Sequence, residues 1–125
     1  MSVLREAQRQ RVERVLRGLV TACPGVIVAT VANKEAVTLA CAPNDPLADA
    51  VSRSATALCA LAEGAALELD GGTVSQVMVR AERAHLVAQW VPPNALLAVL
   101  CSSKTALGGI IVEVAAAARE LAGVV

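Results

Sequence analysis

Residues 95–109 read ALLAVLCSSKTALGG, an apolar run followed by a polar loop with a Lys-Thr pair and then two glycines. A strand, a loop of this composition and a helix also make up a phosphate-binding loop. In such loops the glycines precede the lysine, so that backbone N–H groups surround the phosphate. Here both glycines follow Lys104. The stretch is therefore not predicted to bind a nucleotide, and Ser102 or Ser103 is expected to cap a helix.

The glycine pair lies inside that helix, which is predicted over residues 104–121. Gly108 and Gly109 each cost about 1 kcal/mol relative to alanine at a helical position. We therefore expect another backbone, from the sheet or from the first helix, to approach this turn closely.

Upstream, the spacing of apolar residues predicts a first helix over residues 3–22, whose polar start, residues 1–11, is expected to project. The helix stops at Pro24 and Gly25, because proline cannot continue it and glycine permits a reversal. A β-hairpin follows, with strands over residues 26–32 and 36–41 and Asn33 in the turn.

The second helix is expected to start at an N-cap, Asn44 or Asp45, and to end near Gly64. Its apolar stripe is predicted to contain Leu47, Val51, Ser54, Ala55, Leu58, Leu61 and Ala62. Three further strands are predicted over residues 73–81, 86–91 and 95–101, with His85 in the turn between the first two. The order α-β-β-α-β-β-β-α predicts one α+β domain over residues 1–125 with a five-stranded antiparallel sheet.

Composition excludes several classes of function. The 125 residues are 56% hydrophobic, and 11 basic residues balance 11 acidic ones, so no field favours nucleic acid or an anionic membrane. One aromatic residue, Trp90, argues against a drug-like ligand pocket. No apolar run spans a bilayer and no signal peptide is recognised, so we expect a cytoplasmic protein without membrane insertion. Four separated cysteines and one histidine are expected to be reduced and metal-free, with no cofactor.

The chain resembles the Roadblock family, which includes Roadblock-type dynein light chains and bacterial MglB-like proteins. Three segments carry the resemblance: Leu16 to Val26, with Pro24-Gly25, the helix from Leu47 to Ala62, and Leu96–Leu100 followed by Leu107-Gly108. The resemblance covers about residues 12–122. It implies two terminal helices on one face of the sheet and the middle helix on the other. The chain departs from the family at Asn33-Lys34-Glu35, where many members carry Asp-Gly.

The resemblance also implies a function. Family members look like non-enzymatic homodimers or heterodimers that act on small Ras-like GTPases or serve as scaffolds, and MglB-like members accelerate GTP hydrolysis by remodelling the switch regions. Second helices pair across the dimer, and third strands join the two sheets. We therefore expect a homodimer that regulates a small Ras-like GTPase; the alternatives are a scaffold without a GTPase, and a small-molecule sensor or enzyme.

The residues themselves favour a partner-facing second helix over a plain alanine-rich surface helix. The face opposite its predicted core stripe is small and weakly charged, which suits a helix–helix contact. The strand over residues 73–81 is half-polar and is expected to be an edge that pairs with a second copy. The predicted interface residues are Ala48, Ser52, Arg53, Thr56, Cys59, Ala60, Glu63, Gln76, Met78 and Arg80.

Catalytic candidates are few. His85 has only Glu82 and Arg83 beside it, and no serine or cysteine is paired with a base at helical spacing. The chain is therefore predicted not to be an enzyme. A GTPase can receive an arginine finger from its partner; Arg53 and Arg80 are the arginines to test, although the resemblance predicts that neither acts as one.

Overall fold

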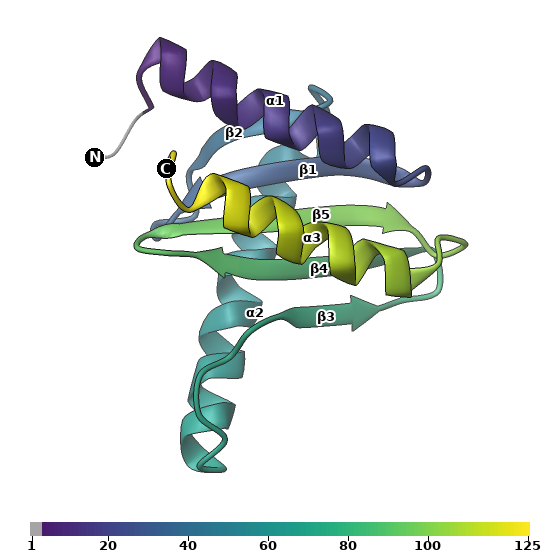
Figure 1. The fold of residues 1–125 in the computed structure, drawn as a ribbon. Helices are drawn as coiled ribbons and strands as arrows, with labels where there is room; N and C mark the ends of the chain where they lie inside the picture. Colours follow the sequence, from purple (N-terminus) through teal and green to yellow (C-terminus); the bar gives the residue numbers. More distant parts are fainter. Residues whose placement is uncertain (1–3) are drawn as a thin grey trace.

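A five-stranded antiparallel sheet lies between two layers of helix in the computed structural model, which describes residues 4–125 (Figure 1). The expected α+β fold and its element order are confirmed. The elements are α1 (Glu6–Ala22), β1 (Val26–Asn33), β2 (Thr38–Ala42), α2 (Ala48–Glu68), β3 (Val77–Arg80), β4 (Ala84–Val91), β5 (Ala95–Ser102) and α3 (Leu107–Leu121).

The strands lie in the order β2-β1-β5-β4-β3, so the apolar run 95–101 forms the central strand. β5 pairs with β1 on one side, where Leu97 lies opposite Val31, and with β4 on the other, where Val99 lies opposite Val87. A strand with neighbours on both sides and helices on both faces must be apolar throughout. That requirement explains why its sequence does not alternate with polar residues.

The two faces of the sheet carry separate cores. On one face α1 and α3 pack over residues such as Val31, Leu97 and Val99. On the other, α2 packs over Val28, Leu96 and their neighbours. Figure 1 shows the two terminal helices in front of the sheet and α2 behind it. This is the arrangement of helices that the family resemblance implies.

α2 is longer than predicted, because it passes through Gly64 and continues to Glu68. One glycine costs only about 1 kcal/mol in a helix, and the alanines that follow are strong helix formers. The helix ends two residues before Asp70, whose φ is +54°. There the N–H of Asp70 donates to the carbonyl of Leu67 and the N–H of Gly71 to that of Ala66, which is a Schellman motif.

The capping predictions for α2 and α3 are both wrong. The N-cap position of α2 is Leu47, with no side-chain cap, and not Asn44 or Asp45. The Asp45 carboxylate instead accepts a hydrogen bond from the N–H of Leu47 at 2.8 Å, within the turn that precedes α2. α3 starts only at Leu107, and neither predicted serine caps it; Ser102 Oγ instead accepts from the N–H of Lys104. That hydrogen bond closes the turn that leaves β5.

The expected close approach at the glycine pair of α3 is wrong. Both glycines are exposed, and a Cβ added at Gly108 or Gly109 would have no neighbour within 4 Å. They lie in the first turn of α3, where nothing packs over them within the described residues.

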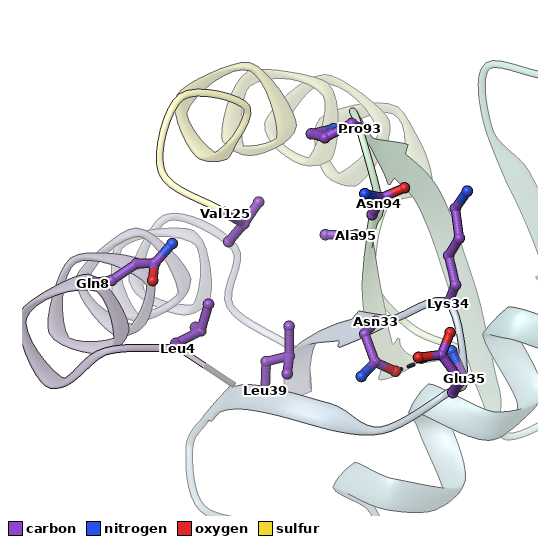
Figure 2. A pocket seen from close by; sticks show the side chains of 10 residues that line it. All are labelled: Leu4, Gln8, Asn33, Lys34, Glu35, Leu39, Pro93, Asn94, Ala95 and Val125. Carbon is purple, nitrogen blue, oxygen red and sulfur yellow. Dashed lines mark hydrogen bonds between the residues drawn. The ribbon is translucent and has the colours of Figure 1, made fainter. Parts of the chain in front are cut away.

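The connection between β1 and β2 is organised by a side chain (Figure 2). Asn33 Oδ1 accepts hydrogen bonds from the N–H groups of Glu35 and Val37, both at 3.0 Å. Positive φ falls on Ala36, at +66°, rather than on Asn33. The hairpin prediction is confirmed, but the asparagine acts through its side chain and not through a left-handed backbone.

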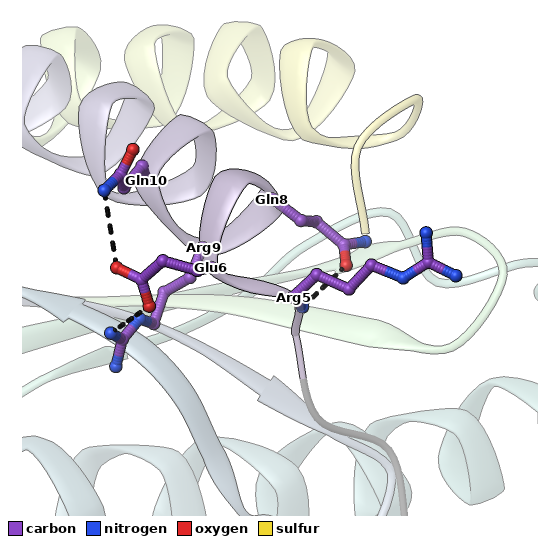
Figure 3. A network of polar contacts seen from close by, with 5 residues as sticks. All are labelled: Arg5, Glu6, Gln8, Arg9 and Gln10. Carbon is purple, nitrogen blue, oxygen red and sulfur yellow. Dashed lines mark hydrogen bonds and ion pairs between the residues drawn. The ribbon is translucent and has the colours of Figure 1, made fainter.

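The start of α1 is exposed but not wholly free of the body (Figure 3). Arg9 forms an ion pair with Glu6, at 2.6 Å between nitrogen and oxygen. The Gln8 side chain donates to the carbonyl of Val124, and Leu4 packs against the core beneath α1. The predicted projection therefore does not describe Leu4 and Gln8, and residues 1–3 lie outside the described part of the chain.

The turn between α1 and β1 requires its glycine. Gly25 has a φ of +103°, and an added Cβ would lie 2.1 Å from Thr105 Oγ1. The Gly25 carbonyl also accepts the N–H of Ser102 at 2.8 Å, so this turn is joined to the loop after β5.

Replacing Gly25 by alanine should lower the free energy of unfolding by about 2–4 kcal/mol, because strain from positive φ adds to a steric clash. In a Thr105→Ala background the clash is relieved, and the cost of Gly25→Ala should fall to about 1–2 kcal/mol. Denaturant unfolding of the four proteins in this cycle measures the difference. Equal costs in both backgrounds would show that Thr105 does not constrain the turn.

Candidate functional site

The face of α2 that packs on the sheet agrees only in part with the predicted stripe: Val51 and Ala55 are buried as expected. Ala48, Ser52 and Cys59, expected at a partner interface, are buried against the sheet. Leu47 and Leu61, expected in the core, are 49% and 71% exposed. The interface prediction is therefore wrong for Ala48, Ser52 and Cys59, because their side chains lie against the sheet.

The physical reason is the size of the side chains. Small residues let the α2 backbone lie close to the sheet, where Ala55 is fully buried and the Ser52 hydroxyl lies 2.7 Å from that of Thr38. The sequence argument assumed that the largest apolar residues of an amphipathic helix point inward. On α2 several of the leucines point outward instead.

The second half of α2 extends beyond the sheet (Figure 1). Leu67 and Leu69 at its end are 84% and 81% exposed. With Leu61 they form what we call the leucine overhang, residues 61–69. Three leucines exposed at the end of a projecting helix make this segment a candidate for contact with another molecule.

Four of the other residues predicted for the α2 interface keep some access to solvent. Arg53, Ala60 and Glu63 are exposed, and Thr56 is half-buried, with its hydroxyl donating to the Ser52 carbonyl. Arg53, Thr56 and Ala60 precede the leucine overhang along the helix, and Glu63 lies within it. Their role at an interface stays a prediction.

β3 is an edge strand, as predicted, but it is shorter, with Val77–Arg80 in place of residues 73–81. Met78 and Arg80 are exposed, so they stay candidates for a contact. Gln76 is held by its own protein, because its Nε2 donates to Gln89 Oε1 at 2.7 Å and to the Ile111 carbonyl. The leucine overhang, at the end of α2, and the free edge of β3 come from elements that follow each other in the chain.

Trp90 lies between two hollows beside α2. One, of about 460 Å³, lies against the turn after β4, and its lining comprises Lys34, Thr56, Ala60, Glu63, Trp90, Pro92 and Pro93. The other, of about 490 Å³, runs under the leucine overhang past Leu67 and Val74. The half-buried ring borders both, and its Nε1 has no hydrogen-bond partner. A tryptophan in this setting is suited to an interface.

His85 does not lie in a turn, because β4 starts at Ala84 and includes it. Its ring is buried, and Nε2 lies 3.2 Å from the Ser103 carbonyl, while Nδ1 has no partner. The cross-strand pairing with Arg80 extends the hairpin further than its composition indicated. His85 therefore has a structural place in the sheet.

The four cysteines are free thiols, and three of them are buried. Burial is the largest cause of the raised pKa at each one, and it raises the pKa of Cys59 to about 11, with a smaller contribution from Glu63. A raised pKa keeps a thiol mostly protonated and slows its reactions at neutral pH, and burial also restricts access of a reagent to the three buried thiols. No cluster of histidine, cysteine and acidic residues suited to a metal occurs among residues 4–125.

The sequence matches the family model of the Roadblock/LC7 domain over residues 13–101, which is most of the chain. The chain belongs to the Roadblock/LC7 domain family. The resemblance seen in the sequence is thereby confirmed. A search of curated proteins gave no match.

Solved structures show the same fold. A Roadblock/LC7 domain from Streptomyces avermitilis has a TM-score of 0.81 with 24% identity, over 87% of this chain and 92% of its own. The gliding protein MglB from Thermus thermophilus has a TM-score of 0.86 with 21% identity, over 98% and 93% of the two chains. An MglB with a tetrameric arrangement has a TM-score of 0.87 with 22% identity, over 98% and 93% of the two chains. None of the helices described here has the length and apolar character to cross a membrane.

The burial of Cys59 predicts a pH dependence of this Roadblock domain. With a folded pKa of about 11 against an ordinary 9.0, the folded state keeps a proton that the unfolded chain loses. The stabilisation is complete below pH 9 and disappears as the pH rises towards 11. Thermal unfolding from about pH 8 to about pH 11 should show a steeper loss of stability in the native protein than in Cys59→Ala. Parallel pH profiles would contradict a dry contact between α2 and the sheet.

Proposed function

We propose that this protein is a non-enzymatic, dimeric regulator or adaptor of a small Ras-like GTPase. The observation that carries the proposal is the leucine overhang, the end of α2 that projects past the sheet with 71–84% exposure of its three leucines. Full burial of a leucine stabilises an association by roughly 1.5–3 kcal/mol. A surface of this kind supports association rather than catalysis.

A second copy is the occupant that suits the overhang. A twofold axis would bring α2 against the α2 of another copy, and β3 against its own counterpart, so that one continuous sheet forms. Met78 and Arg80 would then lie near the junction, and Arg53 and Ala60 beside the paired helices. The tetrameric arrangement of one MglB structure shows that this fold self-associates in that protein.

The GTPase is supported by family membership and by the surface beside the paired helices. Two α2 helices side by side would form a broad platform, and the hollow at Trp90 opens next to it on each copy. Such a surface offers shape and apolar contact. It would therefore act on a GTPase by holding a conformation of its switch regions and not by donating a reactive group.

Replacing Leu61 by glutamate should convert the dimer to a monomer at about 10 µM, since burying an unpaired charge in an apolar interface costs several kcal/mol. Light scattering after size exclusion measures the mass. Val112→Glu is the matched control, because Val112 is 64% exposed on α3, away from α2. A native protein that is already monomeric, or a Leu61→Glu variant that stays dimeric, would contradict the proposed interface.

Nucleotide dependence tests the GTPase partner. The tagged protein, incubated with lysate of its source cells, should retain a small GTPase with a non-hydrolysable GTP analogue and not with GDP. Arg53→Ala and Arg80→Ala should leave any stimulated hydrolysis within a few-fold of the native rate, whereas loss of an arginine finger costs about 10³-fold or more.

The other outcomes identify other functions. The same partners retained with both nucleotides, and no GTPase among them, would indicate a scaffold. A loss of stimulated hydrolysis of about 10³-fold in either arginine variant would show that this chain donates a catalytic group after all.

A further inference from the structure

The sheet has a second edge, which the proposed dimer leaves free. β2 is the outermost strand on that side and pairs only with β1. Its sequence, Thr38 to Ala42, contains neither charge nor proline, and the register shifts at Leu39, which has no partner on β1. Exposed edges usually carry charges, proline or a covering element. β2 therefore presents backbone donors and acceptors at an edge that only its short length and the irregularity at Leu39 protect.

A hollow of about 550 Å³ runs along this edge, between α1 and the start of α2. Its lining residues are Arg9, Glu13, Thr38, Leu39, Ala40, Cys41, Asn44, Asp45, Pro46, Ala48 and Asp49. A second hollow, of about 390 Å³, shares Glu13, Cys41 and Asn44 and continues past Pro43. Together the two hollows follow β2 from one end to the other.

Acidic groups outnumber basic ones around the edge, where Arg9 and Arg17 are the basic lining residues. Glu13 comes from α1, Asp45 from the turn before α2, and Asp49 from the first turn of α2. Figure 3 shows Arg9 paired with Glu6, which is the only ion pair within residues 4–125. Glu13, Asp45 and Asp49 therefore form no ion pair within that part of the chain. Arg17 lines only the second hollow.

Cys41 lies among these carboxylates and lines both hollows. Burial is the main cause of the raised pKa of its thiol, a hydrogen bond from the Asp45 backbone lowers it, and the negative charges of Glu13, Asp49 and Asp45 raise it further. All three carboxylates are thus close enough to act on one point of β2.

We propose that β2 accepts an extended segment of a partner protein as a sixth strand, and that this segment carries two consecutive basic residues. Successive side chains of a strand point to opposite faces of the sheet. One basic residue then meets Glu13 in the layer of α1, and the next meets Asp45 and Asp49 in the layer of α2. Backbone hydrogen bonds supply affinity that is independent of sequence, and the carboxylates supply selectivity. The proposal does not depend on the GTPase or on the contact through α2.

The probe is a capped synthetic peptide of about ten residues, with alternating valine and threonine around a central lysine–arginine pair. The control peptide has two glutamines in place of that pair. Amide shifts of the ¹⁵N-labelled protein should be confined to the neighbourhood of Thr38–Ala42. Alkylation of Cys41 should slow on binding, and Cys41 dominates this signal because the other three thiols are buried. The control peptide should bind about tenfold more weakly at low salt.

Charge variants test the selectivity. Glu13→Gln combined with Asp49→Asn should weaken binding of the basic peptide about five- to tenfold and leave that of the control peptide unchanged. Glu82→Gln combined with Glu120→Gln makes the same change of charge at exposed sites away from the lining of the two hollows, and should have no effect.

Three results would overturn the proposal. They are amide shifts centred on Val77–Arg80 instead of β2, unchanged alkylation of Cys41 at saturating peptide, and equal loss of affinity in both double variants. Loss of the dimer in the Leu61 variant would leave peptide binding at β2 intact, so this test and that of the proposed function fail independently.

Discussion

The packing of β5 is the constraint on which the rest of the molecule depends. Leu97 and Val99 point into the core under α1 and α3, and Leu96 and Ala98 into the core under α2, all with at most 1% exposure. The same strand supplies the central hydrogen-bond ladders to β1 and β4. Each helix layer therefore rests on alternate residues of one strand, so a polar side chain there would be buried whichever way it pointed.

Much of this fold follows from the sequence alone. The continuous apolar run 95–101, the proline and glycine after α1, and the asparagine after β1 act locally, and the elements that they define were predicted in the right order. Boundaries were less predictable where two local preferences compete. Gly64 favours an end to α2, but the helix formers after it outweigh that preference, and the signal that stops the helix is the left-handed Asp70. β3 is shorter than predicted for a different reason: only Val77–Arg80 find partners on β4.

The candidate site was harder to predict, because it depends on how a helix is rotated about its axis. The spacing of leucines in α2 is consistent with a stripe, but it does not show whether that stripe faces the sheet or a partner. The decisive information is the distance between helix and sheet, which small residues such as Ala55 and Ser52 set. A signal was present in the sequence: alanine, serine and cysteine at positions 48, 52, 55 and 59 share one helix face. The edge of β2 also required the fold, since Glu13 and Asp49 are brought together only by the packing of α1 and α2 on the same strand.

The end of α2 has a consequence for how the molecule assembles. Its last turns lie beyond the sheet, so within one copy they receive little packing, and an isolated helix of that length is marginal in water. In the proposed dimer their order would depend on the second copy that covers them, and the free energy of association would include the cost of fixing that segment. In a solitary subunit these turns should exchange their amide hydrogens orders of magnitude faster than β5, so hydrogen exchange along α2 reports directly on the extent of assembly.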